Sequence, residues 1–144
     1  MRLKKVDWQL VVLVCSIIII MIMGVRQSLG LFLEPISQFM QDGKEFFSLA
    51  IGFQAIIWGV VTFGLGILID KFGPQKVLAF GIICFASGIF LMSNPANQLT
   101  LFSATTLMGF GLGGAGMATM VSIAGKVAPP EKRSLAMGLI AAAA

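Results

Sequence analysis

Charged and apolar residues are segregated along this chain rather than mixed. Residues 8–25, 46–69 and 77–125 contain no Asp, Glu, Lys or Arg. A helix needs about 20 apolar residues to cross a bilayer, so each of the first two runs suffices for one crossing. The third run is long enough for two, and residues 93–100 (SNPANQLT) interrupt it with a proline and three amides. The pattern predicts transmembrane helices near 8–34, 46–69, 77–93 and 99–124.

The composition agrees with a membrane location. Of the 144 residues, 58% are hydrophobic and 11% are charged, whereas a soluble domain carries about 25% charged residues. A soluble helix bundle would need polar faces toward water, and these runs have none. The prolines fall outside the predicted helices or at their ends, and Pro35 directly follows the first of them. We therefore expect an all-α membrane protein, a polytopic helix bundle that has the lipid bilayer as its partner.

Alternate connections between the predicted helices carry nearly all of the basic residues. Those at the N-terminus and in the second and fourth connections are Arg2, Lys4, Lys5, Lys71, Lys76, Lys126, Lys132 and Arg133. The first connection has only Lys44, and the third has none. Because cytoplasmic loops are enriched in Lys and Arg, this division predicts a cytoplasmic N-terminus in the cell (inner) membrane. The first apolar run is too long for a signal peptide and precedes no cleavage site, which favours an uncleaved helix.

A fifth apolar segment begins at residues 134–144 (SLAMGLIAAAA). As a helix it would rise about 16 Å, half of the roughly 30 Å that a hydrocarbon core requires. A helix that stopped there would leave open carbonyl groups in lipid. We therefore expect residues 1–144 to be a partial N-terminal transmembrane domain of a longer protein.

Little in the chain points to catalysis, to a metal or to a cofactor. There is no His or Tyr, and Cys15 and Cys84 lie within apolar runs without ligand-type spacing. Residues 109–114 (GFGLGG) fit G-x-G-x-x-G, but a dinucleotide site needs a strand before this motif. Gly109 and Gly113 instead form a G-x-x-x-G pair that permits close helix packing. The net charge of +4 forms no basic stripe, so no nucleic-acid partner is expected.

Arg26 directly follows the first uncharged run and is itself followed by further apolar residues, and it allows two interpretations. It lies 18 residues after Trp8, about 27 Å along a helix. The first helix could end there, with the guanidinium at the outer headgroups. Alternatively the helix continues to Pro35, and Arg26 faces a water-filled cavity and binds substrate. The apolar residues that follow favour the second interpretation, since ionisable residues within membranes usually mark a substrate pathway.

The second predicted helix carries a stripe that could accompany Arg26. Gln54, Trp58 and Thr62 recur every four residues and so share one helical face. Gln54 lies about 24 Å from Asp70 along the helix, which puts it near the depth of Arg26. The two could line one cavity, with Gln54 as hydrogen-bonding group and Trp58 as apolar wall. Contacts between helices and an interfacial aromatic explain the stripe equally well.

The connection at residues 66–76 (GILIDKFGPQK) concentrates charge and turn residues between two uncharged helices. Gly66 would let another helix approach, Asp70 places a negative charge at a helix end, and Gly73 with Pro74 makes the turn. An ordinary charged connector explains these residues too. However, the segment resembles the signature loop of major facilitator superfamily transporters, Gly-x-Leu-x-Asp-Arg-x-Gly-Arg-Arg-x. It matches at Gly66, Leu68, Asp70 and Gly73, has Lys71 for Arg and Lys76 as the final base, and departs at Pro74 and Gln75.

Other segments extend this resemblance over essentially the whole chain. Residues 128–138 (APPEKRSLAMG) resemble the superfamily, and residues 24–32 (GVRQSLGLF) with 47–59 (FSLAIGFQAIIWG) resemble its monocarboxylate and oxalate/formate carrier branch. The resemblance implies a fold of twelve helices in two halves, of which this chain holds about four and a half. It also implies a basic residue at the place of Arg26 that holds a substrate carboxylate.

The same resemblance gives roles to further residues. It implies that Asp70 latches the cytoplasmic side against the N-terminal end of a helix in the other half. The family often has an Arg shortly before its glycine cluster, where this chain has Thr105, which argues against proton coupling by this helix. The implied function is secondary transport of a small organic anion by alternating access. The alternative is a self-standing membrane protein that acts by oligomerising or scaffolding, and an enzyme is not expected.

Overall fold

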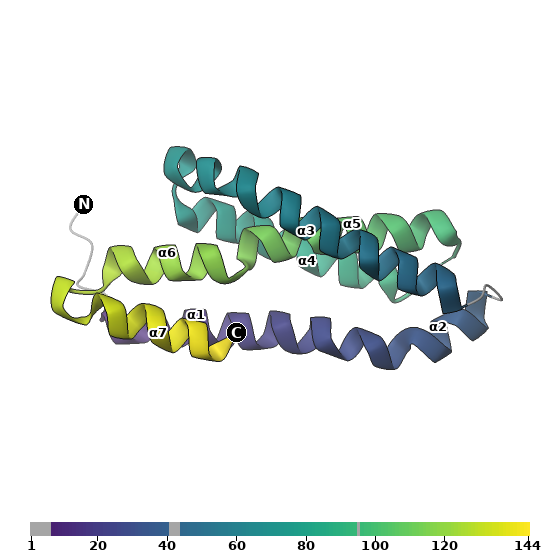
Figure 1. Cartoon of the computed structure of the whole chain (residues 1–144), viewed down its shortest axis with the longest axis horizontal. Coiled ribbons are helices and arrows are strands. Elements are labelled where there is room, and N and C mark those ends of the chain that lie inside the picture. Colours follow the sequence, from purple (N-terminus) through teal and green to yellow (C-terminus); the bar gives the residue numbers. More distant parts are fainter. Residues whose placement is uncertain (1–6, 41–43, 95) are drawn as a thin grey trace.

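A computed structural model describes residues 7–40, 44–94 and 96–144 of the chain. These residues fold into helices joined by short turns (Figure 1). The elements in chain order are α1 (Trp8–Ser28), the 3-10 turn η1 (Leu29–Phe32), α2 (Leu33–Met40), α3 (Lys44–Phe72), α4 (Pro74–Met92), α5 (Gln98–Ala115), α6 (Met117–Val127), the 3-10 turn η2 (Pro130–Lys132) and α7 (Arg133–Ala143).

Four of the helical stretches are long and apolar enough to cross a membrane. They are Trp8–Gln38, Glu45–Phe72, Pro74–Met92 and Gln98–Val127. The first two spans each contain one uncharged run of the sequence, and the last two share the third run, because a run without charges is the part of the chain that lipid accepts at lowest cost. Their exposed positions carry large apolar side chains, such as Phe63 at 86% and Phe90 at 78% exposure. Such surfaces suit contact with lipid or with further helices.

The first span is longer than the sequence predicted. The expected helix ended at 34, but the helical path continues through η1 and α2 to Met40. Pro35 is the third residue of α2, and in the first turn of a helix its missing N–H breaks no hydrogen bond. The 3-10 turn from Leu29 to Phe32 joins the two α-helical parts. Arg26 therefore lies inside a long span rather than at its outer end.

The fourth span is interrupted, which the sequence pattern did not predict. α5 ends at Ala115 and α6 begins at Met117, and Gly116 between them has an extended backbone (φ −78°, ψ −174°). A Cβ on Gly116 would collide with the Leu112 carbonyl oxygen, so this geometry requires glycine. Figure 1 shows the green helix changing course at this point.

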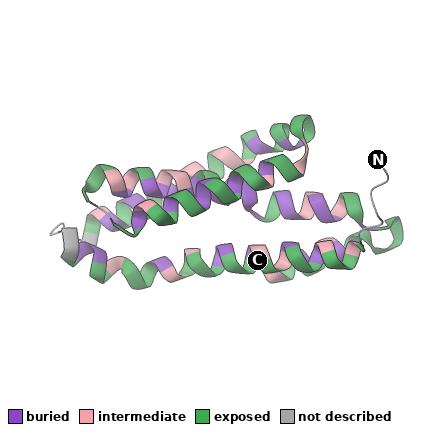
Figure 2. Cartoon of the chain, turned by 180° about the vertical axis from the view of Figure 1, so that it is seen from behind, coloured by how far each residue is buried: buried purple, intermediate pink, exposed green. Residues whose placement is uncertain are grey.

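The helices form two groups that the fourth span connects. α3, α4 and α5 pack against one another, while α6 packs against α7, α1 and α4 (Figure 1). The fourth span is the most enclosed of the four. In its most apolar stretch of 18 residues 67% are buried, compared with 11% in the second span. Figure 2 shows the exposed residues along the outer sides of the helices and the buried ones between them. The core includes Ile19, Met108, Leu112, Met120 and Ile140, all inaccessible to solvent.

Glycine allows α4 and α5 to approach backbone to backbone. A Cβ added to Gly81 would lie 2.5 Å from the Gly114 carbonyl carbon, and one added to Gly88 would lie 2.8 Å from the Ala104 carbonyl oxygen. A Cβ on Gly111 would meet Phe85 at 2.6 Å. Small residues at a helix interface bring backbones together and so increase dispersion contact, which drives helix association in lipid.

Candidate substrate-binding site

Arg26 lies in the last turn of α1 and its side chain turns toward α3. The guanidinium carbon is 4.8 Å from the centroid of the Trp58 ring, which is cation–π distance. Its Nε atom is buried and has no hydrogen-bond acceptor among the described residues. The guanidinium thus lies against an aromatic face inside the bundle, which supports the cavity interpretation over an anchor at the headgroups.

Gln54 lies on α3, one helical turn before Trp58. The residue is 1% exposed, and its Nε2 donor has no acceptor in the described part of the chain. Leaving a buried donor unpaired costs about 1–3 kcal/mol, so such groups call for a ligand or water. Arg26 and Gln54 therefore present two buried donors without acceptors in one region.

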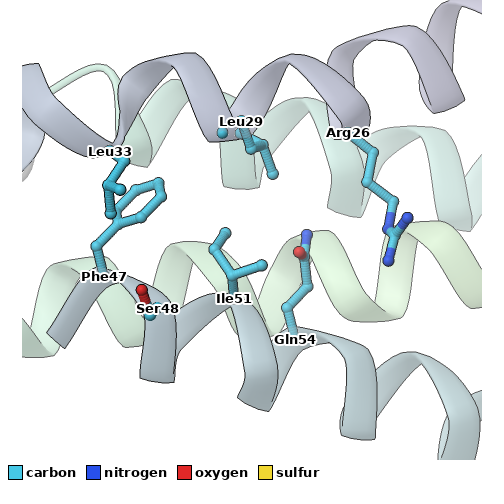
Figure 3. Close-up of a pocket in the computed structure, with 8 residues that line it drawn as sticks. Arg26, Leu29, Leu33, Phe47, Ser48, Ile51 and Gln54 are labelled. Atoms are coloured by element: carbon cyan, nitrogen blue, oxygen red, sulfur yellow. The ribbon is translucent and has the colours of Figure 1, made fainter. Parts of the chain in front are cut away.

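Both residues line one cavity of about 360 Å³ between the first span and α3 (Figure 3). Its remaining walls come from both helices: Leu29, Gly30, Leu33, Phe47, Ser48 and Ile51. The sequence predicted a shared cavity for Arg26 and Gln54 because helical rise puts them at similar depth. These wall residues were missed, because which side chains face a gap depends on how the helices are rotated.

Trp58 and Thr62 belong to a neighbouring cavity rather than to this one. That cavity has about 550 Å³ and lies between α3 and the break in the fourth span, with Gly113, Gly116 and Met117 among its lining residues. The Thr62 hydroxyl donates a 2.7 Å hydrogen bond to the Trp58 carbonyl, so it is satisfied within its own helix. Trp58 lies in contact with Arg26 and lines this second cavity.

Gly109 and Gly113 set the distance between α5 and α3. A Cβ on Gly109 would lie 2.9 Å from Ile57 Cγ2 and 3.0 Å from the Gln54 carbonyl oxygen. A Cβ on Gly113 would lie 2.7 Å from Val61 Cγ1. α5 thus supports the backbone of α3 directly behind Gln54, which fixes that wall of the cavity.

Comparison with known proteins decides the family. Residues 9–144 match the family model of the Major Facilitator Superfamily. The chain belongs to the major facilitator superfamily. A curated relative, the uncharacterized MFS-type transporter YcxA of Bacillus subtilis (strain 168), is 28% identical over 98 residues, which make up 68% of this chain. The chain spans only 23% of that relative's length. No solved structure gives a significant match.

Membership of the major facilitator superfamily confirms two predictions from the sequence. The chain is an all-α transmembrane bundle that corresponds to part of the major facilitator fold, and it comes from a multi-pass membrane protein of a transporter family. The carrier branch, the substrate and the orientation stay predictions.

The segment that resembles the superfamily's signature loop joins α3 to α4, about 24 Å along α3 from Gln54. Gly73 has φ +86° and ψ 150°, a conformation open essentially to glycine, and its N–H donates a 3.0 Å hydrogen bond to the Ile69 carbonyl. Pro74 then begins α4, where its fixed φ suits a first helical residue. This turn, rather than charge, defines the loop's shape.

The side chains that match the superfamily signature in this loop lie at the surface, whereas Ile69 is buried. Leu68, Asp70, Lys71 and Lys76 are exposed, and the Lys71 ammonium lies 5.5 Å from the Phe72 ring centroid. The expected close approach of a helix at Gly66 is not found within the described chain, since nothing lies within 4 Å of an added Cβ. The loop thus has its free surface available for another part of a transporter.

Thr105, which by the resemblance stands for an arginine of the superfamily, is buried within α5. It is inaccessible to solvent, and its hydroxyl donates a 3.0 Å hydrogen bond to the Phe102 carbonyl. The hydroxyl is therefore satisfied within α5 and carries no charge. Arg26 is the arginine that lies within a described span.

Proposed function

We propose that this chain is the N-terminal part of a secondary transporter that moves a small organic anion, such as a monocarboxylate, by alternating access. The proposal rests on a pair of buried donors beside one cavity, Arg26 Nε and Gln54 Nε2, for which the described residues offer no acceptor. A carboxylate is an acceptor-only group, so it matches two donors and the positive charge together.

The physical cost of Arg26 supports the same conclusion. A charged side chain within a bilayer costs several kcal/mol unless water, a counter-ion or a ligand accompanies it. The Trp58 ring offsets part of this cost, but the flat guanidinium can still take a carboxylate by two parallel hydrogen bonds. A carboxylate substrate supplies the negative charge that Arg26 lacks, but only while it is bound. The site can therefore both bind the substrate and release it. The resemblance of residues 24–32 to monocarboxylate carriers also supports the proposal.

The rest of the transport pathway would come from outside this chain. In secondary transporters the substrate site lies at the interface of structural repeats near the bilayer midplane. The proposed orientation has the N-terminus and the α3–α4 connection in the cytoplasm, because these carry most of the basic residues. Superfamily membership favours this proposal over a self-standing scaffold protein.

Substitution of Arg26 in the intact protein tests the proposal. Arg26→Ala should weaken carboxylate uptake affinity by roughly 10–150-fold, which corresponds to the loss of a charged hydrogen bond of about 1.5–3 kcal/mol. Arg26→Lys should restore part of the affinity, because it keeps the charge but loses the forked geometry. Gln27→Ala, an exposed neighbour, is the control. Unchanged affinity with impaired membrane insertion would show that Arg26 is an interfacial anchor instead.

A further inference from the structure

The cavity beside Arg26 is chemically divided along its length. In Figure 3 the donors of Arg26 and Gln54 lie toward one end, while Leu33 and Phe47 meet at the other. Leu29 and Ile51 form the walls between these ends. Phe47 and Leu29 are 4% and 5% exposed, so their apolar surfaces belong to the protein interior. A ligand that fills this cavity therefore meets a polar end and an apolar end.

We infer that the site selects monocarboxylates that carry an apolar tail, with the carboxylate at Arg26 and Gln54 and the tail toward Leu33 and Phe47. The inference rests on the proposed function and names the substrate class within it. An apolar tail gains by leaving water for a wall of Leu, Ile and Phe side chains, and the gain grows with each methylene buried. A very small acid would leave the apolar end unfilled.

The same division disfavours dicarboxylates. A second carboxylate at the apolar end would lose its water without gaining a cation, which is strongly unfavourable. Ser48 is the remaining polar side chain of the cavity, but it is uncharged and already has an interaction partner. A hydroxyl cannot neutralise a desolvated carboxylate. Among the lining residues that the structure describes, Arg26 is the cation, so the cavity can neutralise one carboxylate.

The size of the cavity limits the tail. Its volume of about 360 Å³ lies near the lower end of the roughly 300–1,000 Å³ that ligand pockets occupy. Gly30 provides a way to reduce it, because it lines the cavity and nothing lies within 4 Å of an added Cβ. A larger side chain at Gly30 can therefore enter the cavity without displacing the backbone.

The test is a competition series on the intact protein in proteoliposomes, from acetate to octanoate, with the dicarboxylates of equal carbon number. We expect affinity to rise about fourfold per added methylene until the cavity is full. Each dicarboxylate should bind on the order of 100-fold more weakly than the monocarboxylate of equal length. Affinity that does not depend on tail length, or stronger binding of dicarboxylates, would overturn the inference.

Longer acids also partition more strongly into lipid, which could by itself make the apparent affinity rise with tail length. Substitutions of Gly30 distinguish this effect from binding of the tail in the cavity. Gly30→Leu should abolish most of the gain with tail length, and Gly30→Ala should reduce it less. Gly52→Leu is the matched control, since Gly52 on α3 is exposed, has the same free space and lies outside the cavity. Equal effects of Gly30→Leu and Gly52→Leu would overturn the inference.

The Arg26 variants keep this result distinct from the proposed function. If Arg26→Ala weakens all monocarboxylates while tail length has no effect, anion transport stands and the tail site is wrong. If no carboxylate competes and Arg26→Ala changes nothing, both are wrong. The amount of each variant in the membrane, measured with a fluorescent fusion, shows whether a loss of uptake is simply a loss of protein.

Discussion

At the scale of single residues, the contact between Arg26 and Trp58 is the interaction that holds the buried guanidinium in place. The guanidinium lies over the indole ring at 4.8 Å, and a desolvated cation–π pair contributes about 0.5–2 kcal/mol. The ring therefore holds the positive charge at the edge of the cavity while no anion is bound. In the proposed site, we therefore expect Trp58 to act on the substrate through Arg26, as a positioning residue.

Trp58→Leu should weaken carboxylate affinity by roughly 2–30-fold, since the guanidinium loses its aromatic support. Trp58→Phe should have a smaller effect, because a phenyl ring still presents a negative face. Uptake kinetics on the intact protein measure both. Phe63→Leu is the control, as Phe63 lies on the same helix at 86% exposure. A loss in Phe63→Leu as large as in Trp58→Leu would show that the effect is not specific to the Arg26 contact.

The sequence could predict part of this site. Helical rise alone places Arg26 and Gln54 at similar depth, so their common cavity was foreseeable. The separation of Trp58 and Thr62 from that cavity was not, because spacing gives a face of one helix but not what that face meets. The apolar end of the cavity was missed for the same reason: Leu33 and Phe47 look like any lipid-facing residues until two helices bring them together.

At the scale of elements, the α4–α5 pair depends on glycine at Gly81. An added methyl group would meet the backbone of Gly114 and Ala115, which cannot move aside as a side chain can. Gly81→Ala should therefore separate the helices and cost about 1–3 kcal/mol of stability. Thermal unfolding of the intact protein in detergent should show a melting temperature lowered by a few degrees.

Gly64→Ala provides the comparison for Gly81→Ala. Gly64 is an exposed glycine of α3 with nothing within 4 Å of an added Cβ. Alanine favours the helix by about 0.5–1 kcal/mol over glycine, so this variant should melt at the same temperature or higher. If both variants lower the melting temperature equally, tight packing at Gly81 is not what stabilises the pair.

The positions of the spans follow directly from the sequence, but two of their irregularities do not. Uncharged runs of about 20 residues or more are typical of membrane helices, so the four spans were predictable. Pro35 suggested a helix end, whereas it lies in the first turn of a new helix, where proline is tolerated. The break at Gly116 was hidden because a glycine-rich stretch predicts close packing and a bend equally well.

At the scale of the whole molecule, orientation in the membrane can be measured by labelling. In a Cys15→Ala, Cys84→Ala background, we expect Ala96→Cys to react with an impermeant maleimide in intact cells. Gln75→Cys should react only after permeabilisation. Both positions are exposed and lie in or next to connections at opposite ends of α4. The reverse pattern would contradict the cytoplasmic N-terminus that the basic residues predict.

We expect Asp70 to act in the conformational cycle of the intact transporter, as the resemblance of its loop to the superfamily signature implies. Its carboxylate is exposed at the end of α3, far along that helix from the Arg26 cavity. The resemblance implies that this carboxylate contacts the N-terminal end of a helix in the other half of the transporter. Such a contact stabilises a carboxylate by about 0.3–1 kcal/mol at an exposed site, which is enough to bias two conformations without locking one. In the intact protein, Asp70→Asn should lower the maximal rate and leave KM within a few-fold.

Glu131→Gln serves as the control for Asp70→Asn, because Glu131 is an exposed acid in another connection. It should leave both kinetic constants near their original values. A collapse of affinity in Asp70→Asn, with the maximal rate preserved, would contradict a role in cycling and would point to the substrate site instead.

The extended residue at Gly116 also has a mechanical consequence. A continuous helix resists bending because a sharp bend breaks its ladder of hydrogen bonds, so a rod across the whole bundle would be stiff. Here the regular helix is already interrupted at Gly116, so a bend at this residue breaks fewer hydrogen bonds than a bend within α5 or α6. α5 is held by α3 and α4, whereas α6 is in contact with α1 and α7 as well as with α4. We therefore expect a small change of angle at Gly116 to shift one group of helices against the other, and Trp58 lies beside this joint, in the cavity that Gly116 also lines.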